Sequence, residues 1–412
     1  MQKNLSSNSD LRLAELIAAL SLATDLGVGQ PMEYTLRSCV LAVRLGETLG
    51  FNESELREAY YQALLRYIGC NAETYMWAAI VGDELALRTD LAALYTGHTS
   101  EVLGLMVRYI RQANEGASPL HLAQMVAQGL LASPQLFKEG SAGHCEVASR
   151  LAARLGFEET IQRALIQSYE RWDGRGLPGE FKGEHIAPAV RVVALAQDVI
   201  IFHRLGGVEA AVAMAQERKG TAHDPRMVER FCQQAAHLLA GIEEEPSWEV
   251  MLALEPGART SLSETQFDAA CSAIADFADM KSPYTLGHSR GVAELAASAA
   301  RRCGLPEADV VAIRRAGLLH DIGRVGVSSG IWEKPGPLSE REWERVRMHP
   351  YYTERVLARP PALARLGALA QRARSGGPAA DRTRTLQEAD KRASHYLPED
   401  RRPPYPAHLQ QD

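Results

Sequence analysis

Apolar residues recur three or four positions apart along most of the chain, which is the spacing of amphipathic helices. The first such pattern covers residues 11–27 and includes Leu13, Leu16 and Leu20. Alternation of apolar and polar residues, which would indicate strands, is nearly absent. The sequence therefore predicts an all-α protein. The expected helices cover residues 11–27, 34–49 and 52–68, followed by segments that reach about 110 and span 120–132.

Two changes in composition divide the chain. Residues 246–261 contain Pro256-Gly257 and are interpreted as a linker, after which Ser263 and Gln266 form an expected capping box. From about residue 371 Arg, Pro, Ala, Asp and Gln dominate, and such a segment buries too little apolar surface to offset the entropy of ordering. The expected organisation is a helical domain over 1–245, a linker over 246–261, a second helical domain over 262–370 and a disordered tail over 371–412.

The two expected domains repeat a pattern at a distance of 254 residues. Residues 50–53 face 304–307 and residues 64–69 face 318–323, while Asp25 and Asp279 fall on the same register. Three matches without a gap predict two tandem helical bundles. The register pairs Tyr34 with His288, Arg66 with His320 and Tyr67 with Asp321. Because arginine cannot ligate a cation, the first copy is expected to keep the helices and to have lost the ligands.

The charge balance narrows the class of protein. A net charge of −6 gives no electrostatic reason to expect direct DNA binding, and no run approaches the roughly 20 apolar residues of a membrane span. The start of the chain is polar and lacks the apolar core of a signal peptide. The six cysteines are scattered without a CxxC pair, which is typical of reduced thiols. The expected location is the cytoplasm.

The chemistry of the second copy centres on His320-Asp321, at the end of an apolar helical run. Burying a carboxylate beside an imidazole is costly unless a cation or hydrogen bonds compensate. Both residue types ligate divalent metals, and a carboxylate can bridge two ions. An isolated His-Asp pair is more often a simple hydrogen-bonded pair, but His288 and His349 flank this one.

These residues resemble a known family. His288, then His320-Asp321 after 32 residues, then His349-Pro350 after a further 29, resemble the first part of an HD-GYP domain, a branch of the HD metal-dependent phosphohydrolases. The resemblance implies an all-α bundle in which His288, His320, Asp321 and His349 hold one or two divalent ions such as iron or manganese. Asp321 and Arg324 would be catalytic, and Arg324, where the family usually has lysine, would bind the phosphate of a nucleotide or cyclic dinucleotide phosphodiester such as cyclic di-GMP.

The first copy carries a stretch that resembles the second signature of the family, HHExxDGxGYP. The matching residues are Glu170, Asp173, Gly174, Gly176 and Pro178, and Asp198 matches the acidic residue of the next helix. Ser168-Tyr169 replaces the histidine pair and Leu177 replaces the tyrosine, while His144 is a candidate counterpart of His349 or a structural histidine. Taken alone, the stretch is a turn rich in glycine and proline. We expect no metal pair in this copy.

The second copy departs from the family after His349. The spacing of the first copy places the missing histidine pair near 373–374, where the sequence has Ala373-Arg374, and no signature follows. His395 and His408 stand in the expected tail and are poor candidates for replacing it. A frameshifted gene is one hypothesis, tested by reading the other two frames past codon 370.

Two functions remain open from the sequence. The first is a metal-dependent phosphohydrolase, impaired by the missing ligands. The second is a non-catalytic regulatory or dimerising member of the family, or a truncated gene product. The sequence leaves the oligomeric state, including a homodimer, undecided.

Overall fold

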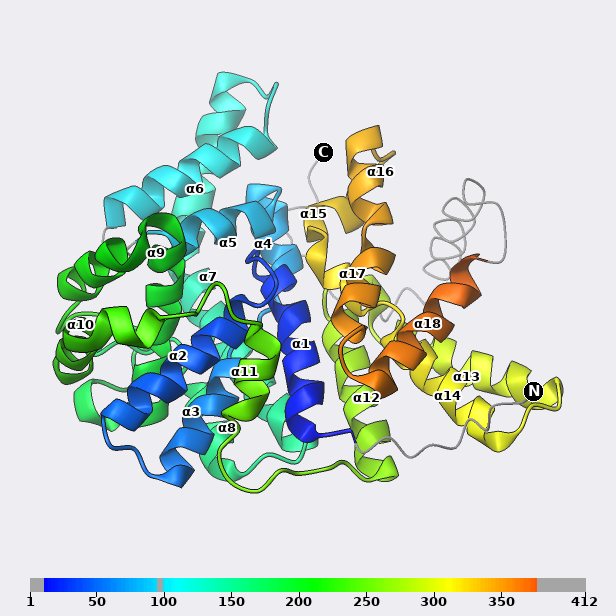
Figure 1. Ribbon diagram of the computed structural model, residues 1–412. Helices are drawn as coiled ribbons and strands as arrows, with labels where there is room; N and C mark the ends of the chain where they lie inside the picture. Colours follow the sequence, from blue (N-terminus) through cyan, green and yellow to red (C-terminus); the bar gives the residue numbers. More distant parts are fainter. Residues whose placement is uncertain (1–10, 95–98, 376–412) are drawn as a thin grey trace.

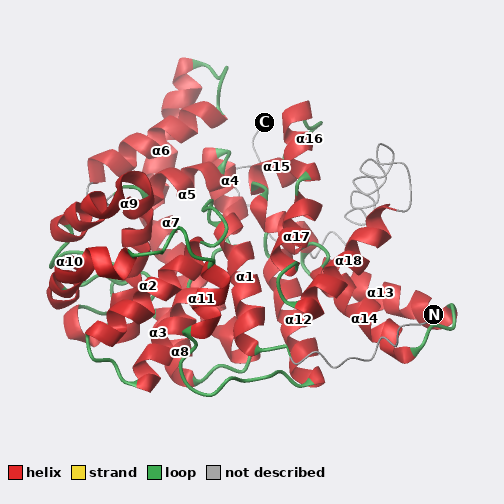
Figure 2. Ribbon diagram, viewed as in Figure 1, coloured by secondary structure: helices red, strands yellow, loops and turns green. Residues whose placement is uncertain are grey.

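The computed structural model describes residues 11–94 and 99–375. Within these ranges the protein is built from helices and loops, without a β-sheet (Figure 2). Pairing of the β type in the described ranges consists of two isolated bridges, Arg12 with Ser261 and Lys219 with His223. The predicted all-α class is confirmed. None of the described helices has the length and apolar character needed to cross a membrane.

The helices of the first half are α1 (Leu13–Gly27), α2 (Tyr34–Thr48), α3 (Glu53–Leu65), α4 (Thr74–Val81), α5 (Glu84–Ala92), α6 (Thr99–Ala113), α7 (Pro119–Arg154), α8 (Glu159–Ile166), η1 (Gly183–His185), α9 (Pro188–Glu217), α10 (Pro225–Leu239) and α11 (Ser247–Ala253). Those of the second half are α12 (Glu264–Asp279), η2 (Pro283–Thr285), α13 (His288–Arg302), α14 (Glu307–Leu319), η3 (Ile322–Gly326), α15 (Ser329–Trp332), α16 (Glu340–Arg347), α17 (His349–Leu357) and α18 (Pro361–Ser375). The expected first three helices and the capping box of Ser263 and Gln266 are confirmed.

The register of the repeat reappears in the structure. Helices α2 and α3 have the same bounds as α13 and α14 once 254 is added to the residue numbers. In the first half the Asp25 carboxylate accepts hydrogen bonds from the backbone N–H and the hydroxyl of Thr35, and in the second half Asp279 does the same with Ser289. These shared contacts favour the interpretation that the bundles are duplicated.

The two halves lie side by side with α1 between them (Figure 1). Helix α1 packs against α2 and α3 of its own half and against η3 and α17 of the other. One continuous cluster of buried apolar side chains runs from Leu11 to Ala370. Both bundles therefore share a core, and α1 belongs to both.

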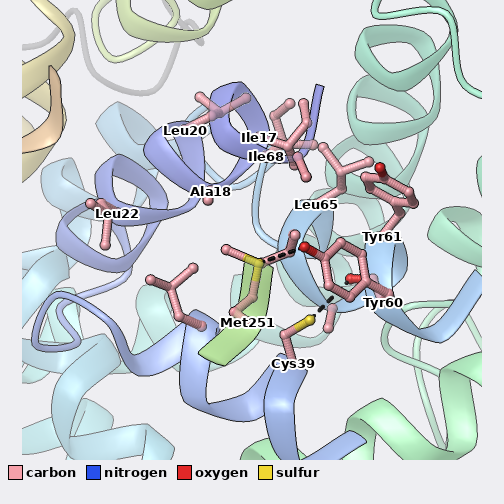
Figure 3. Packing of buried hydrophobic residues seen from close by; sticks show 14 of the residues in the cluster. Ile17, Ala18, Leu20, Leu22, Cys39, Tyr60, Tyr61, Leu65, Ile68 and Met251 are labelled. Carbon is pink, nitrogen blue, oxygen red and sulfur yellow. Dashed lines mark hydrogen bonds between the residues drawn. The ribbon is translucent and has the colours of Figure 1, made fainter. Parts of the chain in front are cut away.

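The expected linker over 246–261 includes helix α11, and α11 packs against α2. Figure 3 shows Met251 of α11 inserted beside α1–α3, where its sulfur accepts a hydrogen bond of 2.6 Å from the Tyr60 hydroxyl. Met251 is fully buried and Trp248 nearly so. The segment is packed onto the first bundle, and the domain boundaries of the sequence stay a prediction.

The expected boundary at residue 370 falls inside a helix. Leu363, Leu366 and Ala370 of α18 are buried, and α18 packs on α14 and α17. Burial of this apolar face against α14 and α17 stabilises the helix, which continues to Ser375, five residues into the predicted tail. The rest of that tail, including His395 and His408, lies outside the described residues.

Candidate metal centre

His320 and Asp321 stand where α14 ends. His320 is the residue after the last turn of α14, and Asp321 precedes η3. The helix crosses α13 closely at Gly317, where an added Cβ would lie 2.7 Å from the Cα of Ala293. The glycine therefore permits the close approach of the two helices that carry His288 and His320.

Three imidazoles converge on the Asp321 carboxylate. The Nε2 atoms of His288 and His320 lie 3.5 and 3.2 Å from Oδ2 of Asp321. The Nε2 atom of His349 lies 3.7 Å from the other oxygen, Oδ1. His288, His320 and Asp321 each offer one ligand atom within 4.8 Å of the others. The Asp321 side chain is 5% exposed and the three histidine side chains are 14–28% exposed, so a buried carboxylate lies beneath partly exposed imidazoles.

The backbone fixes which nitrogen of two of these rings is available. The Nδ1 atom of His320 lies 2.7 Å from the carbonyl oxygen of Gly317, and that of His349 lies 2.5 Å from the carbonyl oxygen of Val346. A carbonyl only accepts, so each Nδ1 donates its hydrogen, and Nε2 is the ring nitrogen that faces Asp321. This is the arrangement by which proteins orient histidines for metal binding.

Helix α17, which begins at His349, is held against the turn after Asp321. An added Cβ at Gly323 would lie 2.1 Å from the carbonyl oxygen of His349 and 2.4 Å from the backbone nitrogen of Thr353. The Thr353 hydroxyl accepts a hydrogen bond of 3.0 Å from the N–H of Gly323 and donates one of 3.1 Å to the carbonyl of His320. Glycine and threonine together set the distance between His349 and the His-Asp pair.

His288 is the first residue of α13 and is placed by a buried cap. Asp279 accepts hydrogen bonds of 2.9 and 2.7 Å from the backbone N–H and the hydroxyl of Ser289. Burial raises the pKa of Asp279 in spite of these bonds.

Arg324 borders the centre. Its Nη1 lies 3.1 Å from Oδ2 of Asp321, and its guanidinium lies 4.3 Å above the Trp332 ring. The Trp332 ring in turn meets the His349 ring edge-on, with 5.8 Å between the ring centres. The guanidinium of Arg324 is thus held between the Asp321 carboxylate and the Trp332 ring, beside the imidazoles.

The corresponding place in the first bundle has a different chemistry. The hydroxyl of Tyr67 donates a hydrogen bond of 3.0 Å to the side-chain oxygen of Gln197, and the Arg66 guanidinium lies 5.4 Å from the Tyr169 ring. Within the described residues, no group of three potential metal ligands gathers there. A guanidinium cannot ligate a cation, and a tyrosine hydroxyl that already binds Gln197 is a poor substitute for Asp or His.

His144 stands in the first bundle as His349 stands in the second. An added Cβ at Gly69 would lie 1.9 Å from the carbonyl oxygen of His144, which mirrors the contact of Gly323 with His349. Burial, and next the nearby Arg88, lower the pKa of His144 to about 3. The ring is therefore neutral at ordinary pH, in the same scaffold position but without the ligand partners.

Asp198 is held in a network of its own. Its Oδ2 lies 2.6 Å from Nη1 of Arg218 and 3.0 Å from Nε2 of His223. Burial alone would raise the pKa of Asp198, but His223 and Arg218 lower it to about 2. The carboxylate is thus neutralised by protein groups.

The signature-like loop of the first bundle is closed on itself. Oε1 of Glu170 accepts hydrogen bonds of 3.1, 2.8 and 3.3 Å from three successive backbone N–H groups, at residues 179–181. Asp173 pairs with Arg171 and accepts from the N–H of Arg175. Gly174 has a positive φ of 76°, the bond between residue 177 and Pro178 is cis, and an added Cβ at Gly176 would meet backbone atoms at 2.4–2.6 Å. These residues build the loop.

The structure brings His288, His320, Asp321, His349 and Arg324 together; their roles as ligands and in catalysis stay predictions. Thr353 and Trp332 were not among the site residues that the sequence indicated. Two signals could have indicated them: Thr353 lies one helical turn after His349, and Trp332 follows Arg324 by eight residues. Neither spacing by itself predicts a contact across the loop, so the geometry was needed.

Known proteins similar to this chain include HD domain proteins and cyclic dinucleotide phosphodiesterases. Residues 285–393 match the HD domain family. The 3'3'-cGAMP-specific phosphodiesterase 3 of Vibrio cholerae serotype O1 is 31% identical over 356 residues, which cover 84% of this chain and 75% of that protein. A cyclic di-GMP phosphodiesterase of Pseudomonas aeruginosa is 43% identical over 74 residues, 18% of each protein.

The fold agrees with a solved structure. The crystal structure of a cyclic GMP-AMP specific phosphodiesterase of V. cholerae matches with a TM-score of 0.63 and 26% identity, covering 94% of this chain and 99% of that one. The class defined by fold and site is that of helical HD proteins. The chain belongs to the HD domain family, in its HD-GYP branch.

Proposed function

We propose that this protein is a metal-dependent phosphodiesterase that hydrolyses a cyclic dinucleotide. The observation that carries the proposal is the convergence of three imidazole Nε2 atoms on Asp321 within 3.7 Å. Relatives named as 3'3'-cGAMP-specific and cyclic di-GMP phosphodiesterases support the substrate class.

The donor set fits one or two divalent ions of the iron or manganese type. Neutral imidazoles suit such ions, and the two oxygens of Asp321, each faced by a histidine, suit a bridging carboxylate. His288, His320, Asp321 and His349 would hold the ions. When bound, such a cation polarises a phosphate oxygen and activates water for attack on phosphorus.

Side chains and backbone groups of the protein would orient the substrate and the metal ligands. Arg324 is proposed to bind a non-bridging phosphate oxygen through the N–H groups that face away from Asp321. This contact would orient the phosphodiester beside the carboxylate and offset the negative charge on the non-bridging oxygens. The carbonyl oxygens of Gly317 and Val346 hold the protons of two imidazoles on Nδ1 and so keep these rings in the binding tautomer.

We propose that the first bundle is a non-catalytic copy. The supports are the replacement of the ligands by Tyr34, Arg66 and Tyr67 and the engagement of Asp198 by Arg218 and His223.

A non-catalytic regulator is the second candidate. The observation that favours it is the sequence Ala373-Arg374 at the place where the spacing of the first copy expects a histidine pair. A centre that lacks these ligands would bind metal more weakly.

The test measures the metal content of the purified full-length protein and its turnover of 3'3'-cGAMP and cyclic di-GMP with Mn²⁺ or Fe²⁺. We expect stoichiometric metal and turnover, both lost in Asp321→Asn, which keeps the shape of the side chain and removes its charge. The matched control is Asp309→Asn on the partly exposed start of α14, which should behave as wild type. A metal-free, inert wild-type protein would favour the regulator instead.

A further inference from the structure

Glu84, the first residue of α5 in the first bundle, directs its carboxylate into the second bundle. The side chain is completely buried. Oε1 lies 2.8 Å from Nζ of Lys281 and accepts a hydrogen bond of 2.8 Å from the N–H of Ser329, and Oε2 accepts one of 2.6 Å from the hydroxyl of Ser328. These three groups all belong to the second half of the chain, on two separate loops.

Glu84 and Lys281 form a charged pair inside the protein. Burial alone would raise the pKa of Glu84, but Lys281 and the hydrogen bonds from Ser328 and Ser329 bring it below its usual range. Burial lowers the pKa of Lys281, and Glu84 opposes that shift. A buried pair of this kind is worth little as a general stabiliser, but removing one partner leaves an uncompensated charge. A role in fixing geometry fits it better than a role in overall stability.

The first loop that Glu84 holds leads to Arg324 and His349. Ser328 and Ser329 open α15, where the Ser328 hydroxyl also caps the N–H of Gly330 at 3.1 Å. Helix α15 ends at Trp332, whose Nε1 donates a hydrogen bond of 3.4 Å to the carbonyl of Arg324. This is the ring on which the Arg324 guanidinium lies and which borders the His349 imidazole.

The contact between the bundles is tight at this point. An added Cβ at Gly330 would lie 2.0 Å from the carbonyl oxygen of Gly82, two residues before Glu84. Helix α15 is thus seated on the start of α5 by backbone contact and by the Glu84 carboxylate together.

The second loop that Glu84 holds leads to His288. The carbonyl of Lys281 accepts hydrogen bonds of 3.1 Å from the hydroxyl of Ser329 and of 3.3 Å from that of Thr74. Four residues after Lys281, the Thr285 hydroxyl donates a hydrogen bond of 2.8 Å to the carbonyl of Asp279. Asp279 is the residue that caps α13 beside His288.

We infer that Glu84 is a positioning residue, through which the first bundle fixes the loops on both sides of the metal centre of the second. The expected effect of Glu84 on metal binding rests on the proposed function. The expected effect of Glu84 on the order of the two loops does not depend on that function. The first bundle then has a role although it lacks the ligands: the site in the second bundle is held in shape by a carboxylate that the first bundle supplies.

The test compares the full-length wild type with Glu84→Gln by hydrogen exchange without metal and by titration with Mn²⁺. We expect faster exchange in residues 282–289 and 328–333, and an affinity for Mn²⁺ about 10-fold weaker, as is usual when a residue that supports metal ligands is lost. The double variant Glu84→Gln/Lys281→Met removes the unpaired cation as well. It should fold if the single variant does not, and it should still show faster exchange in both segments.

The matched control is Asp83→Asn, the same chemical change one residue earlier. Asp83 also bridges the two halves, with Oδ2 2.7 Å from Nη1 of Arg345, but that pair is partly exposed. An asparagine retains the acceptor that caps Ala86. The control should therefore match wild type in both measurements.

The inference would be overturned if both segments exchanged at the wild-type rate in Glu84→Gln or in the double variant. Weaker Mn²⁺ binding without any change in hydrogen exchange would also overturn it. A wild-type protein that binds no Mn²⁺ would instead count against the proposed function, and the exchange data would still decide the role of Glu84.

Discussion

Gly323→Ala is the change for which the structure gives the sharpest expectation. The added Cβ would lie 2.1 Å from the carbonyl oxygen of His349. A carbon–oxygen contact is ordinarily about 3.3 Å or longer, so α17 must move by about 1.2 Å or the turn after Asp321 must yield by as much. The atoms in the way are backbone atoms, which cannot rotate aside as a side chain could.

Two effects follow from that displacement. Overpacking at a buried contact costs about 1–3 kcal/mol of the free energy of unfolding. The displaced backbone carries His349, and a shift of about 1 Å at a ligand is expected to weaken metal binding and turnover by about 10- to 100-fold. Urea unfolding and titration with Mn²⁺ measure the two effects separately.

Two further glycines serve as controls. Gly69→Ala makes the same clash in the first bundle, with 1.9 Å to the carbonyl oxygen of His144, and should lose similar stability while Mn²⁺ affinity stays at the wild-type value. Gly291→Ala, within α13, has no atom within 4 Å of the added Cβ and should be stabilised by up to about 1 kcal/mol. The reasoning is refuted if Gly323→Ala binds Mn²⁺ as wild type does, or if Gly69→Ala weakens that binding equally.

Three further changes test neighbouring parts of the account. Thr353→Val removes both hydrogen bonds between α17 and the His-Asp turn and should weaken Mn²⁺ binding about 10-fold, while Thr353→Ser should restore it; equal affinities in the two variants would exclude the role of the hydroxyl. Arg324→Ala should lower turnover roughly 100-fold with little change in Mn²⁺ affinity, measured by steady-state kinetics, and unchanged kcat would remove Arg324 from the reaction. The pKa of His144 is lowered from 6.5 to about 3 in the folded protein. Between these two pH values the unfolded chain protonates this histidine and the folded protein does not. The free energy of unfolding therefore falls as the pH is lowered from 6.5 toward 3. At pH 5 this loss amounts to about 2 kcal/mol. Urea unfolding at several pH values should show the decrease in the free energy of unfolding in wild type and a smaller decrease in His144→Gln. An identical pH dependence in the two proteins would contradict the assignment.

The sequence predicted the fold class and the first helices because both depend on local patterns. Apolar spacing and end signals such as Gly50 fix where a helix forms and stops. The change in composition placed the end of the second domain at residue 370, whereas α18 continues to Ser375 from a buried face formed by Leu363, Leu366 and Ala370. Packing against α14 and α17 is a tertiary property that composition does not report.

For the candidate metal centre, the sequence indicated which residues to consider. Histidine and aspartate at spacings of 32 and 29 residues resemble the family pattern, and the structure places these side chains around Asp321. The supporting groups were not predictable. Glu84 lies 197 residues from Lys281, and an isolated glutamate at the start of a helix ordinarily indicates only a favourable helix end.

The central claim is that His288, His320, Asp321 and His349 hold a divalent cation while the matching residues of the first bundle do not. The most direct measurement is an anomalous-scattering map of crystals grown with Mn²⁺. We predict a strong peak between the three Nε2 atoms and the Asp321 carboxylate and none near Tyr34, Arg66 and Tyr67. An empty second bundle, or a peak in the first, would contradict the account.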